Sequence, residues 1–250
     1  MKERLYEYLL MLGDNSMILG HRLSELCGHG SSLETDIALT NISLDLFGQV
    51  RSYFQYAAEI KGGDATEDSI AFLRFDRDYR NTILVEQPNT DFAYVIGRQF
   101  FFDAFHKPLL EQLMKSNDET IAAIAAKSIK ESKYHLRFST SWVKRLGDGT
   151  EESHERMQAA IHHLYPFVHE LFNETPVEKE MKELGIGADL DAIKIIFEET
   201  IHSVFEAATI EIPQIPNRQT NGKQGIHTEQ MGFILANLQY MQRAYPNMQW

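Results

Sequence analysis

The fold is decided first by residues 2–27, which read KERLYEYLLMLGDNSMILGHRLSELC. Leucines recur along this stretch at intervals of three, four and seven residues, a spacing that places them on one face of a helix. A second apolar face runs through Tyr6, Leu10 and Met17. A helix that is apolar on two sides belongs inside a bundle, so the stretch predicts a buried helix in an all-α protein.

The same helical period recurs in three further long segments. With residues 2–27, the predicted bundle helices are 34–60, 91–115 and 118–146. Four long helices in two hairpins, joined by one longer connection, describe a ferritin-like four-helix bundle. Accessory helices are predicted at about 151–172, 189–208 and 226–244, with a proline-containing arm at 210–225. We therefore expect a single domain over residues 1–250, in which 151–250 holds the accessory helices and the arm.

The amino-acid composition argues against several classes of function. The formal net charge is −12, which argues against a nucleic-acid partner because phosphate contacts need a basic surface. No apolar run approaches the length of a membrane span, so we expect no membrane association. A single cysteine, Cys27, excludes an intrachain disulfide and suits a reducing cytoplasm, where we expect the protein to reside.

Each long helix carries one acid near its middle, on or beside an apolar stripe. These acids are Asp14, Asp45, Asp103 and Glu131. Burying an ionised carboxylate alone costs several kcal/mol, so an inward acid needs a metal, a cationic partner or several hydrogen-bond donors. The acids are therefore the candidate site.

A di-iron bundle meets this need with a Glu from each of two helices and Glu-x-x-His from each of the other two. Three residues after Asp45 and Glu131, this chain has Gly48 and Tyr134. Glycine offers no side-chain ligand, and tyrosine is a poor replacement for imidazole. We therefore predict vestigial di-iron positions, no bound metal or other cofactor, and no catalytic residue in this chain.

Polar side chains near the four acids could stabilise the buried carboxylates without a metal ion. Gln49 follows Asp45 by four residues, His106 follows Asp103 by three, and His135 follows Glu131 by four. We predict a metal-free buried network of acids, histidines and amides. The alternative to this network is that the acids lie on solvent-exposed helix faces and that the histidines are core side chains with hydrogen-bond partners of their own.

Several motifs resemble one known family. They are Leu12–Asn15, Asp36–Leu39, Asn41–Leu46, Leu84–Asn89, Tyr134–Ser139 and Gln239–Arg243. These stretches resemble the C-subunit family of bacterial phenylacetyl-CoA epoxidase complexes, and the likeness covers essentially the whole chain to Gln249-Trp250.

The resemblance implies a division of labour. A related A subunit holds the di-iron site and epoxidises the aromatic ring of phenylacetyl-CoA, with electrons from a separate reductase. The C subunit is a non-catalytic partner that pairs with the A subunit and stabilises it. The resemblance also implies a hetero-oligomer, an indirect link to the reductase and at most peripheral contact with phenylacetyl-CoA. When the chain is isolated, it implies a possible homodimer.

Two other functions stay open at this point. The chain could be a metal-binding ferritin-like oxidoreductase with a shifted ligand set: Asp14, Asp45, Asp103, His106, Glu131 and His135. It could also be an oligomeric binding module unrelated to oxygen chemistry. For the partner-facing surface, the candidates are the arm at 210–225 and the terminal helix to Trp250.

Overall fold

The computed structural model describes residues 1–246 and 248 and divides the chain into two compact units. Unit 1 comprises Met1–Pro88, Thr175–Met181 and Asn221–Trp250, and unit 2 comprises Asn89–Glu174 and Lys182–Thr220. In the described range the chain is helical without a β-strand, apart from an isolated bridge between Asn221 and Ile226. This confirms the all-α, ferritin-like fold class. The single domain over residues 1–250 stays a prediction.

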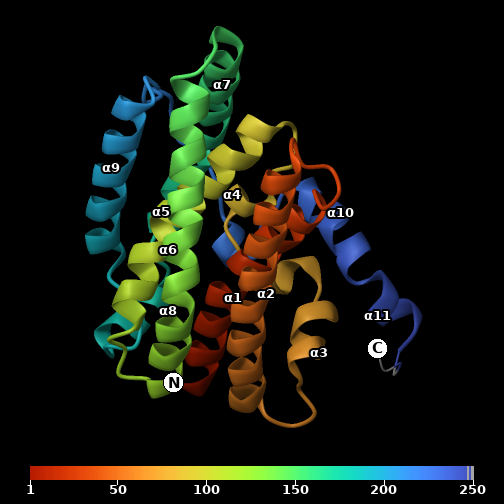
Figure 1. Ribbon diagram of the computed structural model, residues 1–250. Helices are drawn as coiled ribbons and strands as arrows, with labels where there is room; N and C mark the ends of the chain where they lie inside the picture. Colours follow the sequence, from red (N-terminus) through yellow and green to blue (C-terminus); the bar gives the residue numbers. More distant parts are fainter. Residues whose placement is uncertain (247, 249–250) are drawn as a thin grey trace. The chain divides into compact units, whose positions relative to one another are not determined.

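Unit 1 is built on a long hairpin of α1 (Lys2–Ser24) and α2 (Leu33–Lys61), which pack along each other (Figure 1). Its smaller elements are α3 (Glu67–Phe72), η1 (Asp76–Asp78), α4 (Ile83–Glu86), η3 (Gly222–Gln224), α10 (Glu229–Leu238) and α11 (Tyr240–Ala244). Helix α3 packs on α2, whereas α4 and α10 pack on α1. The C-terminal part of the chain thus returns to the N-terminal hairpin. The end of the predicted terminal segment, Gln249-Trp250, lies outside the described residues.

Unit 2 is built on a second hairpin, of α5 (Phe92–Leu113) and α6 (Glu119–Gly147). Both helices also contact α7 (Glu151–Val168) and α9 (Leu190–Ala207), and η2 (His169–Phe172) follows α7 directly. Helix α8 (Pro176–Glu183) spans the division between the units. Because α5 has neighbours on several sides, the run Phe100-Phe101-Phe102 is almost completely buried, and its rings pack in the core of unit 2.

Local sequence explains where the long helices begin and end. Ser32 caps α2 in a capping box with Thr35, and Asp91 caps α5 by accepting from the Tyr94 backbone N–H at 2.8 Å. Gly62 ends α2 with a φ of 72°, a conformation that favours glycine. Helix α1 ends at Ser24 rather than at residue 27, because the chain tightens into turns before Gly28.

Two short helices in the connections did not follow from the sequence pattern. These are α4 and α8, of four and eight residues. Segments this short carry too few turns to show a helical period. Over the described residues, no helix is both long and apolar enough to cross a membrane.

Candidate functional site

Asp14 lies in the middle of α1 and is completely buried. Arg74, which follows α3, donates to both carboxylate oxygens, with 2.9 Å between its Nη1 and Asp14 Oδ2. The backbone N–H of Arg80 donates to the same Oδ2 at 2.8 Å. Asp14 therefore has a cationic partner together with a backbone donor, two of the ways to stabilise a buried carboxylate.

Arg74 is itself held in place. Its side chain is only 8% exposed, and its guanidinium carbon lies 4.0 Å from the centre of the Tyr79 ring. Its Nε donates to the Ile70 carbonyl at 2.6 Å and its Nη1 to the Asp78 carbonyl at 3.0 Å. A metal ion at Asp14 would have to displace a cation that is buried, stacked and hydrogen-bonded.

Asp103 of α5 is the buried acid of unit 2. Gln99 Nε2 donates to its Oδ1 at 2.7 Å, and Ser139 Oγ on α6 lies 2.7 Å from its Oδ2. Burial raises the pKa of Asp103 to about 7, while the charge of His135 and the hydrogen bonds from Ser139 and Gln99 act to lower it. Gln99 and Ser139 are neutral donors, and near neutral pH the carboxyl group of Asp103 is divided between its protonated and ionised states.

Ser139 can serve both protonation states of Asp103. Its Oγ also lies 3.1 Å from the His135 carbonyl oxygen. With Asp103 ionised, the hydroxyl donates to the carboxylate. With Asp103 protonated, the acid donates to Oγ and the hydroxyl turns its own proton to the carbonyl.

The two predicted histidines lie in the same unit as Asp103. His135 is completely buried, and His106, one turn beyond Asp103 on α5, is 4% exposed. Burial, together with the nearby His135, lowers the pKa of His106 to about 3, so its ring stays neutral. That ring lies 4.8 Å from the centre of the Phe102 ring. His106 is therefore held among core aromatic groups.

The remaining predicted positions differ in burial. Gln49 is buried, Asp45 and Glu131 are half-buried, and Gly48 and Tyr134 are exposed. The prediction that Gly48 and Tyr134 are buried together with the acids is therefore wrong. The reason is helical geometry: both lie on helix faces directed to solvent, and a Cβ at Gly48 would meet no atom within 4 Å. Membership of all nine residues in one network stays a prediction.

The donor set does not fit a di-iron pair. One acid is engaged by Arg74, another by neutral donors, and the two positions expected to supply imidazole carry Gly48 and Tyr134. Among residues 1–246 and 248, no group of three or more histidine, cysteine, aspartate or glutamate side chains is arranged to hold a metal ion.

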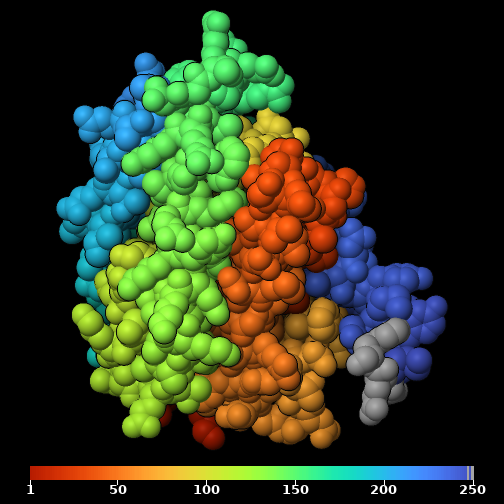
Figure 2. Space-filling model, in the orientation of Figure 1, coloured from red at the N-terminus to blue at the C-terminus, as the bar shows by residue number. Residues whose placement is uncertain are grey.

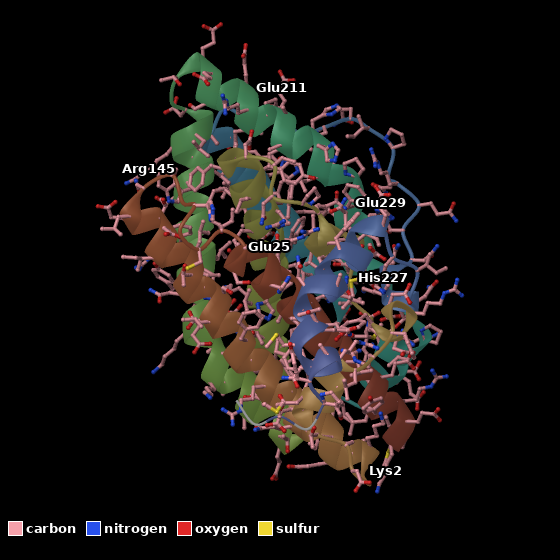
Figure 3. The ribbon with its side chains drawn as sticks, turned by 90° about the vertical axis from the view of Figure 1, so that its right-hand side faces the viewer. Lys2, Glu25, Arg145, Glu211, His227 and Glu229 are labelled. Carbon is pink, nitrogen blue, oxygen red and sulfur yellow. The ribbon has the colours of Figure 1, made fainter. Side chains whose placement is uncertain are left out.

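A third buried acid, Glu86 at the end of α4, was not singled out from the sequence. It is completely buried and accepts from Asn81 Nδ2 at 2.9 Å and from the Thr228 hydroxyl at 2.8 Å. His227 Nδ1 lies 2.5 Å from Glu86 Oε1, and its Nε2 lies 3.1 Å from the Tyr79 carbonyl oxygen. Figure 3 labels His227 beside the start of α10.

Both ring nitrogens of His227 therefore face acceptors, an arrangement that suits the doubly protonated ring. Burial acts to lower the pKa of His227, but the hydrogen bond and the charge of Glu86 outweigh it, and the pKa is raised. A glutamate directly after the apolar run Leu84-Val85 was the one sequence signal for this site.

Unit 1 also contains an open cavity of about 480 Å³ between α2, α3 and α10. Its lining is largely apolar and includes Phe47, Phe54, Phe72 and Leu238, with Arg51 at the side of α2.

Comparison with known proteins places these features in a family context. The whole chain, residues 1–250, matches the model of a family described as phenylacetic acid catabolic protein. The chain is 47% identical over 247 residues to the C subunit of 1,2-phenylacetyl-CoA epoxidase from Escherichia coli (strain K12), and the alignment covers 99% of each chain.

Proposed function

This chain belongs to the phenylacetic acid catabolic protein family, and from this premise we propose that it is the non-catalytic subunit of a multicomponent phenylacetyl-CoA epoxidase. It pairs with the di-iron catalytic subunit and stabilises it. The name of the Escherichia coli relative supports membership of the complex. The observation that supports the non-catalytic role is the ion pair of buried Arg74 with Asp14, because Asp14 stands at an expected metal-ligand position and its carboxylate is bound to a cationic side chain.

The other assignments follow from this role. The chain binds no cofactor of its own, and the iron pair belongs to the catalytic subunit. Its contact with the reductase is indirect, and its contact with phenylacetyl-CoA is at most peripheral. It acts in the cytoplasm, which agrees with a free thiol at its single cysteine, Cys27.

Metal analysis of the purified chain and of the co-expressed complex tests the proposal. We expect iron to follow the catalytic subunit and to be absent from the separated chain after growth with excess iron. We also expect the two chains to copurify. About two irons per chain, with oxygen consumption on reduction, would contradict the non-catalytic role.

The alternative is an oxidoreductase with the shifted ligand set. Its support is the burial of Asp103, His106 and His135 in one unit. Substituting Asp103 separates the two functions. Asp103→Asn leaves ring epoxidation by the assembled complex unchanged if the chain is a scaffold, and abolishes it if Asp103 binds a working metal.

A further inference from the structure

The N-terminal half of α2 has an apolar face directed to solvent. Leu33 is 71% exposed, Ile37 52% and Leu44 60%, and Gly48 continues the same side of the helix. Figure 2 shows α2, in red-orange to orange, at the surface of the molecule. From Leu33 to Gly48 the face is about 22 Å long at 1.5 Å per residue.

This face differs from the solvated side of an ordinary helix. In place of the charged residues that normally cover such a side, it presents three large aliphatic side chains and the uncharged Asn41. Exposed aliphatic residues grouped along one helix face mark an interaction surface, whereas scattered ones do not. At Gly48 a Cβ would meet no atom of this chain within 4 Å, so another backbone can approach closely there.

The acidic residues beside this face indicate what kind of partner binds to it. Between Arg22 and Arg51 the chain has no lysine or arginine, and the half of α2 that carries the face contains Glu34, Asp36 and Asp45. A second copy would bring these acids against their equivalents, since a two-fold interface pairs a surface with itself. Two chains with a net charge of −12 each also repel one another. The face therefore suits an apolar surface with basic flanks on a different chain.

We propose that the face of α2 from Leu33 to Gly48 binds a helix of the di-iron catalytic subunit that carries apolar side chains flanked by lysine or arginine. This rests on the proposed function. The far end of the face adjoins the cavity of unit 1, because Phe47 and Arg51 line that cavity and neighbour Gly48 on the helix. The cavity is open to receive an apolar side chain from the bound helix.

The test compares variants of the full chain, each co-expressed with the catalytic subunit. Ile37→Glu and Leu44→Glu place a charge within the apolar face and should each weaken the complex about tenfold or more. Ile195→Glu is the matched control, because Ile195 is an aliphatic residue on α9 with an exposed fraction of 60%. We expect this control to bind as the unsubstituted chain does.

Gly48→Leu separates binding from folding. A Cβ at this position meets no atom of this chain within 4 Å, and leucine has a higher helix propensity than glycine. The isolated variant should therefore melt at the same temperature as the unsubstituted chain or at a higher one. It should nevertheless bind the catalytic subunit more weakly. Affinity should also fall as salt is raised, because the flanking charges are screened.

The outcomes are distinct. If the unsubstituted chain fails to bind the catalytic subunit, the proposed function fails and this proposal with it. If it binds, but Ile37→Glu, Leu44→Glu and Gly48→Leu bind like Ile195→Glu, the proposed function stands and the assignment of the face is wrong. A homodimer of the isolated chain that Ile37→Glu dissociates would make a second copy the occupant. Affinity that is independent of salt would contradict the basic flanks.

Discussion

Asp14 and Asp103 are both completely buried acids in the middle of long helices, yet the two units stabilise them differently. In unit 1, Asp14 receives two hydrogen bonds from the guanidinium of Arg74 and one from a backbone N–H. In unit 2, Asp103 has the neutral donors Gln99 and Ser139, and burial raises its pKa to about 7. The first acid is stabilised as one half of an ion pair, and the second gains stability by holding a proton.

This difference shows that a buried carboxylate is not by itself a sign of metal binding. Glu86 provides an intermediate case, because its partner His227 is a cation only when protonated. The three acids thus accept side-chain hydrogen bonds from a permanent cation, a titratable cation and neutral donors, and Asp103 also lies near enough to His135 to be affected by its charge. Substitution of one partner at a time can therefore measure what each contributes.

The largest effect is expected from Arg74→Met. The substitution leaves Asp14 buried without its cation and should lower the free energy of unfolding by roughly 3–5 kcal/mol at neutral pH. Urea denaturation measures the loss. Arg77→Met, which changes an exposed arginine nearby, is the control and should change stability little. Adding Asp14→Leu to Arg74→Met should recover most of the loss, and equal losses for Arg74→Met and Arg77→Met would contradict the ion pair.

Next in size is the pH dependence carried by Asp103. Its pKa in the folded chain is raised to about 7, so the folded state binds more protons than the unfolded state between about pH 4 and 7. Stability from this group is therefore lost as pH rises through that window, by at most roughly 1.4 kcal/mol per pH unit. Asp103→Asn should remove this slope from the denaturation free energy.

Asp191→Asn is the control for Asp103→Asn, because Asp191 is exposed on α9. The control should leave the pH slope as it is in the unsubstituted chain. A slope that survives Asp103→Asn would assign the proton to another group.

A smaller effect is expected from His227→Gln, because Asn81 and Thr228 still donate to Glu86. The raised pKa of His227 means that its contribution is complete below about pH 6.5 and is lost as pH rises through the folded-state pKa. We expect a loss of about 1–2 kcal/mol at pH 6 and a smaller one at pH 9. Hydrogen exchange over residues 221–246 measures it at both values.

His202→Gln, at an exposed histidine of α9, is the control for the His227 prediction. It should leave exchange over residues 221–246 unchanged at both pH values. A loss from His227→Gln of the same size at pH 6 and pH 9 would show that the ring acts without its second proton.

The smallest effect is expected from Ser139→Ala. It removes one donor from Asp103 and should cost about 1 kcal/mol. Because the hydrogen bond from Ser139 lowers the pKa of Asp103, its loss should also move the midpoint of the pH-dependent stability upward. Ser141→Ala, an exposed position on the same helix, should leave the midpoint in place. An unchanged midpoint in Ser139→Ala would indicate that this hydroxyl donates only to the backbone.

The long helices and the fold class could be predicted from the amino-acid sequence. Residues 2–27 predicted α1 and residues 91–115 predicted α5, because the spacing of apolar side chains along a helix is local information. The sequence also identified Asp14 and Asp103 as buried acids, since burial follows from position on an apolar stripe.

The partners of the buried acids could not be predicted, because they come from distant parts of the chain. Arg74 lies sixty positions from Asp14, and His227 lies 141 positions from Glu86, so no local period connects them. The short helices α4 and α8 escaped prediction for a related reason, because tertiary packing rather than periodicity stabilises so few turns. Helical period tells which side of a helix is buried. The charge and protonation of a buried group depend on which side chains the folded chain brings to it.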